Sequence, residues 1–301
     1  MLDVIIVGAG PAGLSAALIL GRCRRNVLIC DAGKPRNASA QAMHGFLTRD
    51  GIAPDEFRRL AREQLRPYEG VELRTIEVVD AEPQDGHFVV MLQDGTRHAT
   101  RKLLLATGVI DELPEIQGIQ ELYGSSVHHC PYCDGWEVRD QPLAIYGKGE
   151  HGYELALELT VWSRDLVLCT DGPAELEEKQ VRRLHDNKIR LCEERIARLE
   201  GTDGMLERVV FENGEVLPRH ALFFFSDEHQ HSPLPEKLGC DFNGRGAVRT
   251  GEYEDTCVDG LYVAGDSSRH VQLVIVAAAE GAQAAFAINT ELLKEDLTTT
   301  V

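Results

Sequence analysis

The pattern of hydrophobic and polar positions repeats one unit twice along the chain. Each copy predicts an apolar strand, a glycine-rich turn, an apolar or amphipathic helix and a second apolar strand that leads to an acid. The predicted strand, helix and strand cover residues 4–7, 14–21 and 27–30 in the first copy, and 143–146, 153–159 and 166–169 in the second. This order forms a βαβ unit, so the pattern predicts an α/β protein with two dinucleotide-binding, Rossmann-like, three-layer domains.

Further strands are predicted after each copy. Apolar segments at 88–92 and 101–105 flank the turn Gln93-Asp94-Gly95-Thr96, and segments at 206–211 and 221–225 flank the turn Glu212-Asn213-Gly214-Glu215. Asp-Gly and Asn-Gly pairs are typical of hairpins. Each βαβ unit is therefore predicted to carry an antiparallel insert. The chain closes with a strand that ends at Gly265-Asp266, followed by an alanine-rich helix over about residues 272–293.

The two glycine-rich turns share the spacing of a dinucleotide-binding fingerprint. The first turn reads Gly8-Ala9-Gly10-Pro11-Ala12-Gly13, and the second reads Gly147-Lys148-Gly149-Glu150-His151-Gly152. The chain advances 23 residues from Gly8 to Asp31 and 24 residues from Gly147 to Asp171, close to the separation of about 20 residues at which such a unit places its ribose-binding acid. Two matches, each between a strand and a helix, favour two dinucleotide sites.

The residue types of the first turn fit a pyrophosphate. Gly8 permits the tight turn, Gly10 lets the backbone approach the phosphates, and Gly13 lets the helix and the strand pack closely. We expect the phosphates at the helix N-terminus, where N–H groups without partners and the helix dipole favour anions. Asp31 is expected to accept hydrogen bonds from a ribose diol.

Composition narrows the classes of partner. A chain of 301 residues with 43% hydrophobic and 27% charged residues predicts a folded protein of two domains. Its net charge of −18 repels nucleic acid and anionic membranes. The apolar start at residues 1–7 runs into the glycine turn and has no basic flank, so it predicts a strand and not a signal peptide. The longest later apolar stretch, 273–279, is too short to span a bilayer, and we expect a cytoplasmic protein.

The run Cys130-Pro131-Tyr132-Cys133-Asp134-Gly135 carries the candidate chemistry. Two thiols separated by two residues close a small disulfide ring, and such motifs supply a thiolate near neutral pH. Asp134 is a candidate general acid and base for the sulfurs. His128 and His129 raise the alternative of a zinc site, but the sequence holds no second C-x-x-C, so we predict no metal. The other six cysteines stand singly and are interpreted as small buried apolar residues.

These motifs resemble those of the low-molecular-weight thioredoxin reductases, in the same order and over nearly the whole chain. The resemblance rests on the first turn, on Ala106-Thr107-Gly108, on the C-x-x-C run and on Val263-Ala264-Gly265-Asp266. It implies one FAD held between the first turn, Pro11 and Ala12 included, and Gly265-Asp266. It leaves His270 and Gln272 as the candidates to face the flavin ring.

The resemblance also carries expectations for the domains and for the two cysteines. It implies a discontinuous FAD-binding domain of residues 1–112 and 240–301, interrupted by an inserted, second nucleotide-binding-like domain of residues 113–239. In this family the first cysteine attacks the substrate disulfide and the second meets the flavin. By position these are Cys130 and Cys133. The family further implies a homodimer.

One departure concerns the second nucleotide site. NADPH-dependent family members commonly carry His-Arg-Arg after the second strand of the inserted domain, where this chain carries four carboxylates and no arginine over residues 169–178. Carboxylates would repel a 2′-phosphate, so NADPH is disfavoured. Gly152 makes the second turn more like an FAD or NAD turn. NADH, a second FAD, or no nucleotide with a ferredoxin-type electron donor all remain open.

The sequence therefore predicts an FAD-dependent, thioredoxin reductase-like disulfide oxidoreductase that is not driven by NADPH. Its expected partner is a thioredoxin-like protein or a small disulfide. The alternatives are an NADH- or NADPH-dependent thioredoxin reductase, a flavin-dependent dithiol oxidase, and a redox-sensing flavoprotein. Dithiol oxidases of this family often carry histidine after the second cysteine, so Asp134 favours the reductase-like chemistry.

Overall fold

The computed structural model describes residues 1–298, which form two compact units. The first unit comprises Met1–Ala38, Gly45–Ile110 and the chain from Glu228 onward, and the second comprises Ser39–His44 and Asp111–Asp227. The second unit is thus inserted in the first. The contacts return to the first unit at Glu228, whereas the sequence placed this return near residue 240, and the domain limits stay a prediction. No helix of the described residues is long and apolar enough to cross a bilayer.

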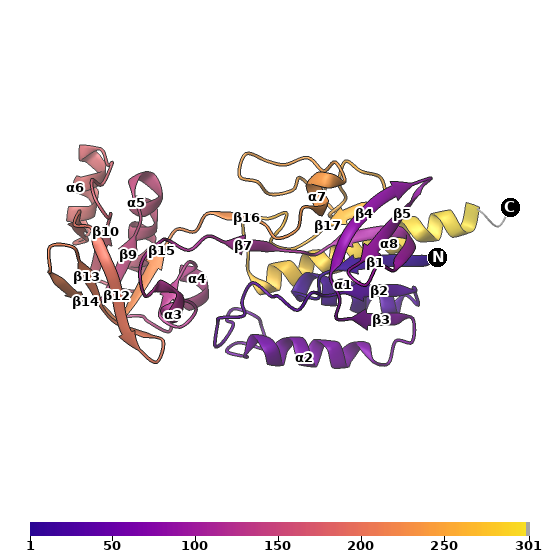
Figure 1. Ribbon diagram of the computed structural model, residues 1–301, viewed down its shortest axis with the longest axis horizontal. Helices are drawn as coiled ribbons and strands as arrows, with labels where there is room; N and C mark the ends of the chain where they lie inside the picture. The colour runs from indigo at the N-terminus through magenta and orange to yellow at the C-terminus, as the bar shows by residue number, and fades with distance from the viewer. Residues whose placement is uncertain (299–301) are drawn as a thin grey trace. The chain divides into compact units, whose positions relative to one another are not determined.

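The first unit is built on a seven-stranded sheet in the order β3-β2-β1-β6-β5-β4, with β17 also paired to β6 (Figure 1). The strands are β1 (Leu2–Val7), β2 (Val27–Cys30), β3 (Val71–Arg74), β4 (Val78–Gln84), β5 (His87–Leu92), β6 (Arg97–Leu105) and β17 (Leu261–Val263). The start of β6 pairs antiparallel with β5, and its end pairs parallel with β1 and β17. The predicted insert and the nucleotide-binding sheet therefore share this one strand.

Alternation along β1 assigns its two faces to two hydrophobic clusters. Val4 and Ile6 pack with α1 (Pro11–Arg22) and α8 (Val274–Thr298), and Ile5 and Val7 point into the opposite cluster. Successive side chains of a strand point to opposite faces, so one strand serves both layers. The remaining helices of this unit are α2 (Pro54–Leu65) and the short α7 (Leu234–Lys237).

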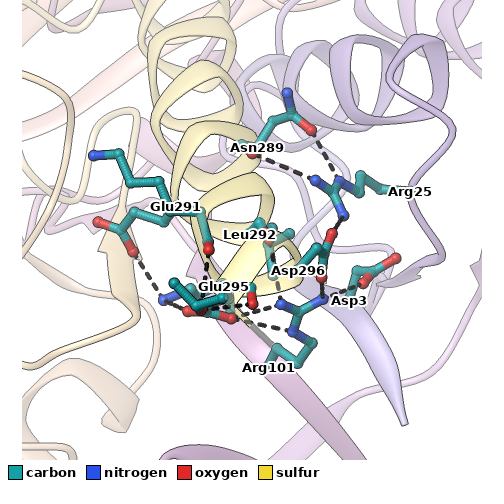
Figure 2. Close-up of polar contacts among 11 residues, drawn as sticks. Asp3, Arg25, Arg101, Asn289, Glu291, Leu292, Glu295 and Asp296 are labelled. Atoms are coloured by element: carbon teal, nitrogen blue, oxygen red, sulfur yellow. Dashed lines mark hydrogen bonds and ion pairs between the residues drawn. The ribbon is translucent and has the colours of Figure 1, made fainter. Parts of the chain in front are cut away.

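Two arginines fasten the C-terminal half of α8 to the sheet (Figure 2). Arg25 donates to Asn289 Oδ1 at 2.9 Å and to Asp296 Oδ2 at 2.7 Å. Arg101 donates to Glu295 Oε2 at 2.7 Å and to Asp3 Oδ1 at 3.2 Å. This network holds α8 along α1, and the glycine turn lies at the start of α1.

The second unit repeats the parallel βαβ core in a five-stranded sheet of order β11-β10-β9-β15-β8. The strands are β8 (Val127–His128), β9 (Leu143–Tyr146), β10 (Leu166–Cys169), β11 (Arg190–Cys192) and β15 (Ala221–Phe224), and the helices are α3 (Ile119–Leu122), α4 (Pro131–Asp134), α5 (Gly149–Glu158), the 3-10 helix η1 (Leu159–Val161) and α6 (Glu178–Asp186). An antiparallel sheet of β12 (Ile196–Thr202), β13 (Met205–Phe211) and β14 (Val216–Pro218) adjoins them, and β7 (Val109–Asp111) pairs with β16 (Glu228–Gln230).

The α/β fold with two Rossmann-like units is confirmed, and one predicted pairing is wrong. Residues 221–225 were predicted to close the second antiparallel insert, but β14 takes that place after the turn at 212–215. β15 instead pairs parallel with β8 and β9. All four of its residues are buried, as expected for a central parallel strand covered on both faces.

Candidate functional site

The first glycine turn joins β1 to α1 and leaves its central glycine open. Gly8 has φ of +104°, and a Cβ there would lie 2.3 Å from the Ala106 carbonyl oxygen. A Cβ at Gly13 would lie 2.0 Å from the Gly8 carbonyl oxygen, whereas at Gly10 no atom of the described residues would come within 4 Å. Pro11 occupies the first helical position, which suits its fixed φ and missing N–H. The turn is therefore packed at its ends and accessible at its centre.

Asp31 lies at the end of β2 and faces this turn. Its Oδ1 accepts a hydrogen bond from the Ala9 N–H at 3.3 Å, and its Oδ2 accepts one from Arg62 Nη2 of α2 at 2.5 Å. The Nε of Arg62 is buried without a hydrogen-bond partner among the described residues. Arg62 was not predicted, because its position beside Asp31 depends on how α2 packs.

Gly265 and Asp266 follow β17 and reach the same end of α1. Gly265 has φ of +86°, and a Cβ there would lie 3.2 Å from the Ala12 Cβ. Its N–H donates to Glu280 Oε2 at 2.8 Å, and Arg269 Nε donates to Glu280 Oε1 at 2.7 Å. Burial raises the pKa of Glu280, and the Arg269 guanidinium opposes that rise. Glu280 thus fixes the backbone that presents Asp266.

Arg36 binds three acceptor side chains, one of which is Asp266. It donates to Asp266 Oδ2 at 2.9 Å and to Gln272 Oε1 at 2.6 Å, and it pairs with Glu228 Oε2 at 3.3 Å. Gln272 also donates to Glu228 Oε1 at 2.6 Å. Of the two residues left open by the sequence, Gln272 lies in this cluster, whereas His270 lies within 3.1 Å of Arg245. Sequence reasoning missed Arg36 and Glu228, because neither residue belongs to a motif and only the fold brings them to Asp266 and Gln272.

The run Ala106-Thr107-Gly108 closes the same edge of the sheet. The Ala106 N–H donates to the Val7 carbonyl at 2.8 Å. Thr107 Oγ1 lies 3.4 Å from Ser267 Oγ, and Ser267 donates to the Gly108 carbonyl at 3.1 Å. The predicted cofactor residues of the first unit therefore meet at the carboxyl ends of β1, β2, β6 and β17, where ligands bind in open α/β sheets.

The two motif cysteines are joined in a disulfide in the second unit. Cys130 is the N-cap of α4, with Pro131 at the first helical position, and the Cys133 N–H donates to Cys130 Sγ at 3.2 Å. A backbone N–H at a helix start favours negative charge on the sulfur that it faces. When the disulfide opens, Cys130 is therefore the sulfur better placed to be a thiolate.

Asp134 ends α4 and is partly buried. Burial raises its pKa to about 7, with His44 opposing the rise and Glu137 adding to it. His128 Nδ1 lies 3.4 Å from Asp134 Oδ2, and burial lowers the pKa of His128 to about 4. Near neutral pH His128 is uncharged, and Asp134 is close to the midpoint of its titration. Asp134 can therefore both release and accept a proton.

His128 and His129 point to different partners. His129 Nδ1 lies 3.1 Å from the Tyr123 hydroxyl, which donates to Asp111 Oδ2 at 3.3 Å. Within residues 1–298, no three His, Cys, Asp or Glu side chains converge as metal ligands.

The second glycine turn has the same spacing as the first but different surroundings. A Cβ at Gly152 would lie 2.5 Å from the Gly147 carbonyl oxygen, so the helix again packs closely on the turn. The Gly149 N–H, however, donates to the Ala174 carbonyl at 3.0 Å, and Ala174 is buried. The Ala174 N–H in turn donates to Glu193 Oε1 at 2.8 Å. The segment after β10 therefore covers the N–H of the central glycine, whereas the space beside its Cα is open, because among the described residues a Cβ at Gly149 would meet only the Glu175 carbonyl oxygen, at 4.0 Å.

The acids near the second turn bind their own chain. Asp171 has φ of +52° and accepts the Ile196 N–H on Oδ1 at 2.7 Å. Glu177 caps α6 by a capping box with Gln180, and Gln180 donates to Glu150 Oε2 at 2.6 Å. Asp171 thus keeps one oxygen for another partner, and the acidic segment is ordered by local contacts.

Comparison with known proteins relates this geometry to a family. A family model described as pyridine nucleotide-disulphide oxidoreductase matches residues 2–281. A probable thioredoxin reductase of Arthroderma benhamiae is 30% identical over 335 residues, which cover 97% of this chain and 81% of that protein. The thioredoxin reductase tcpT of Claviceps purpurea is 30% identical over 310 residues, 98% of this chain and 95% of that one. The crystal structure of a putative thioredoxin reductase, TrxB, from Bacillus anthracis superposes with a TM-score of 0.93 at 35% identity, covering 98% of this chain and 100% of that one.

Proposed function

This chain belongs to the pyridine nucleotide-disulphide oxidoreductase family, as a thioredoxin reductase-like flavin-dependent disulfide oxidoreductase, and on that premise we propose that Cys130 and Cys133 exchange electrons between FAD and an external disulfide. The expected partner is a thioredoxin-like protein or a small disulfide. The observation that carries the proposal is the Cys130–Cys133 disulfide with the partly buried Asp134, whose pKa is raised, next to it in the chain.

Membership of this family implies FAD, and the first unit fits it. The open space at Gly10 leaves room for a pyrophosphate, and Asp31 offers a carboxylate to a ribose diol. Asp266 and Gln272, which both bind Arg36, would lie toward the flavin end of the FAD. FAD bound there would supply two-electron redox chemistry.

The thiol chemistry belongs to the protein's own residues. The Cys130 thiolate attacks a sulfur of the substrate disulfide, a bond forms between the two sulfurs, and the other substrate sulfur leaves with the bonding pair. The Cys133 thiolate then attacks Cys130, which restores the Cys130–Cys133 disulfide and releases the second substrate thiol. Asp134, whose pKa is raised to about 7, supplies the proton that a leaving thiolate takes up. Each cycle consumes two electrons.

We propose that NADPH does not supply those electrons. A nucleotide at the second turn would have to displace the Ala174 carbonyl from the Gly149 N–H, and a 2′-phosphate would meet Asp171, Glu177 and Glu178. NADH and a second FAD carry no 2′-phosphate and so avoid the repulsion by the acids, but they would still have to displace the Ala174 carbonyl. A ferredoxin-type donor avoids both obstacles, because it needs no nucleotide in the second unit.

The covered turn also favours a second candidate function, a flavin-dependent dithiol oxidase. In that direction a small dithiol reduces the Cys130–Cys133 disulfide, and the electrons pass by way of the flavin to oxygen. This reaction requires no nicotinamide cofactor, which agrees with the covered Gly149. Asp134 can act in this direction too, since a group near its midpoint both accepts and releases a proton, although aspartate at this position favours the reductase-like chemistry. Oxygen consumption during dithiol turnover separates the two functions, and a redox sensor would show no turnover.

The homodimer and the cytoplasmic location remain proposals. Phe286 and Leu293 of α8 are exposed by 62% and 50%, and Tyr253 lies with its ring centroid 6.2 Å from that of Phe286. Exposed aromatic and aliphatic side chains of this kind are typical of subunit contacts. Light scattering of the purified protein at micromolar concentration decides between monomer and dimer.

Trapping experiments test the assigned roles of the two cysteines. In Cys133→Ser, Cys130 still attacks a disulfide substrate but cannot be released, so a stable mixed disulfide should accumulate. In Cys130→Ser no such adduct should form, although flavin binding should persist in both variants. Equal trapping by both variants would contradict the roles, and turnover in either variant would overturn the proposal of a dithiol mechanism.

A further inference from the structure

Two further cysteines meet at the edge of the parallel sheet in the second unit. Cys169 is the last residue of β10 and Cys192 the last residue of β11, and the two are direct partners in the parallel pairing. Paired residues of neighbouring parallel strands point to the same face, and the strands lie about 4.8 Å apart. Disulfides join Cα atoms separated by about 4.4–6.8 Å. Strand pairing therefore places the two Cα atoms at a separation that a disulfide can span, with both side chains on one face of the sheet.

The two thiols have unequal surroundings. Cys169 is 0% exposed and packs in the apolar cluster, whereas Cys192 is partly exposed. The Cys169 thiol donates a hydrogen bond to Cys192, and the Glu194 N–H also points to it, which together lower the pKa of Cys192 to about 6 against the effect of burial. The same hydrogen bond and burial raise the pKa of Cys169. The more exposed sulfur of the pair, that of Cys192, is therefore the one that loses its proton more easily.

We propose that Cys169 and Cys192 form a second, reversible dithiol-disulfide pair that hydroperoxides oxidise. The Cys192 sulfur attacks the peroxide, the O–O bond breaks, and a sulfenic acid and one water or alcohol result. The Cys169 sulfur then attacks the Cys192 sulfur, its proton leaves with the hydroxyl group as water, and the disulfide forms. The two cysteines lose two electrons and the peroxide gains them. Two equivalents of a small thiol reduce the Cys169–Cys192 disulfide again by exchange, and they become a disulfide themselves.

This pair is connected to the cover of the second glycine turn. The Thr170 N–H donates to the Cys192 carbonyl at 2.9 Å, and the Gly172 N–H donates to the Glu193 carbonyl at 3.0 Å. Glu193 also accepts the Ala174 N–H, and Ala174 covers Gly149. A bond between the ends of β10 and β11 would fix the strands from which this segment starts. The pair is therefore placed to hold the cover in position under oxidising conditions.

Other cysteines serve as internal controls. Cys30 is buried, and desolvation raises its pKa to about 11, so it should not react with peroxide. Cys23 is exposed and reports oxidation that depends on access alone. Because the proposal does not require the Cys130–Cys133 pair, it can be tested in a full-length variant that lacks both of those cysteines. Failure of the proposed function and failure of this inference are then separate results.

The test begins with reduced, full-length, flavin-loaded protein carrying Cys130→Ser and Cys133→Ser. After hydrogen peroxide treatment and alkylation, peptide mapping should find the Cys169 and Cys192 peptides joined, with the loss of two hydrogens, and dithiothreitol should separate them. Cys30 and Cys23 should remain available for alkylation once the protein is unfolded. Separate alkylation of Cys169 and Cys192, or pairing of Cys192 with any other cysteine, would overturn the proposal.

Single variants test the order of the two steps. With Cys169→Ala, the sulfenic acid on Cys192 has no resolving thiol, so dimedone should label Cys192 heavily, and it should label the protein with both cysteines hardly at all. With Cys192→Ala, Cys169 should stay unlabelled. Equal dimedone labelling of Cys192 with and without Cys169 would show that the two sulfurs do not react with each other and would contradict the pair.

Discussion

The two glycine turns have the same spacing and the same secondary structure on either side, yet they differ in what covers their central glycine. Neither glycine is crowded, since a Cβ at Gly10 would meet no atom of the described residues within 4 Å and one at Gly149 would meet only the Glu175 carbonyl oxygen at 4.0 Å. The Gly149 N–H, however, is bound by the Ala174 carbonyl. Both turns pack the helix against the strand through their last glycine. The spacing of the fingerprint therefore reflects the packing of the βαβ unit, and the chain that follows the second strand determines whether the N–H of the central glycine already has an acceptor.

The difference originates after the acid that ends each βαβ unit. Asp171, Gly172 and Glu175 have φ of +52°, +117° and +56°, and these left-handed residues turn the chain back toward Gly149. After Asp31, in contrast, Gly33 is the one residue of the segment 31–38 with positive φ, and Arg36 reaches Asp266. Left-handed conformations of non-glycine residues carry strain, and at Asp171 the hydrogen bond from the Ile196 N–H to the side chain helps to offset it.

The largest expected effect comes from filling the open glycine. Gly10→Leu should leave the ligand-free fold intact, since nothing in the described residues obstructs its side chain. It should nevertheless weaken FAD binding by on the order of a hundredfold or more, equivalent to about 3 kcal/mol, because the pyrophosphate can no longer approach. Flavin absorbance per chain after purification measures the loss.

The matched change in the second turn is Gly149→Ala, at a position with φ of +54°. This variant should lose some stability and keep its flavin. Loss of flavin in Gly149→Ala, or full retention in Gly10→Leu, would show that the two turns have been assigned the wrong roles.

A second difference between the units is the charge of the side chain that lies next to an acid with a raised pKa. Glu280 is paired with Arg269, whereas Asp134 faces an uncharged His128. The pKa of Asp134 rises from 3.8 to about 7 on folding, so its contribution to stability is complete below about pH 4 and is lost as the pH rises through 7. Relative to Asp134→Asn, the protein should lose about 2–4 kcal/mol over that range.

Urea unfolding at several pH values measures this loss, with Asp134→Asn as the reference. A constant difference between the two proteins from pH 4 to pH 8 would contradict the raised pKa. Disulfide turnover that depends on the protonated carboxyl should fall above pH 7 in the unmodified protein only.

The two ribose-binding acids provide a smaller contrast. Asp31→Ala should weaken FAD binding by about 1–2 kcal/mol, because it removes hydrogen bonds to a charged acceptor. Asp171→Ala should leave the flavin in place and lower stability by about 1 kcal/mol, because the Ile196 N–H loses its acceptor. Titration of each unfolded and refolded protein with flavin measures the effect on FAD binding, and thermal unfolding measures the effect on stability. An equal reduction of FAD affinity in both variants would contradict the assignment of FAD to Asp31 and not to Asp171.

The smallest expected effect is none at all. Replacing Glu177 and Glu178 by arginine removes the charge that opposes a 2′-phosphate but leaves the Ala174 carbonyl on Gly149. NADPH should therefore still fail to reduce the flavin, as measured by stopped-flow absorbance without oxygen. Rapid reduction in this variant would show that charge, and not the cover, closes the second turn.

Local patterns predicted most of the fold and the reactive cysteines. Strand alternation and the glycine turns located β1, β2, β9 and β10, and a four-residue motif located the disulfide. The partners of those residues were not predictable, since Arg36, Arg62 and Glu280 reach the site through long-range packing. No residue type indicates the Ala174 cover, because it depends on backbone conformation.

The single cysteines illustrate both limits of sequence pattern. The interpretation as buried apolar residues is wrong for Cys23 and Cys257, which are exposed. Cys169 and Cys192 stand singly in the sequence, and only the register of β10 with β11 makes them neighbours. The burial of each cysteine and the pairing of Cys169 with Cys192 both depend on how the strands assemble into the sheet.

The central claim is that FAD binds at the first turn alone, that it exchanges electrons with the Cys130–Cys133 pair, and that NADPH does not reduce it. The direct test is an anaerobic absorbance titration of the purified flavoprotein, first with NADPH and then with a small dithiol such as dithiothreitol. The account predicts an unchanged flavin spectrum with NADPH and bleaching with the dithiol, and no dithiol bleaching in Cys133→Ser. Rapid bleaching by NADPH, faster than by NADH at equal concentration, would contradict it and would assign the second turn to NADPH.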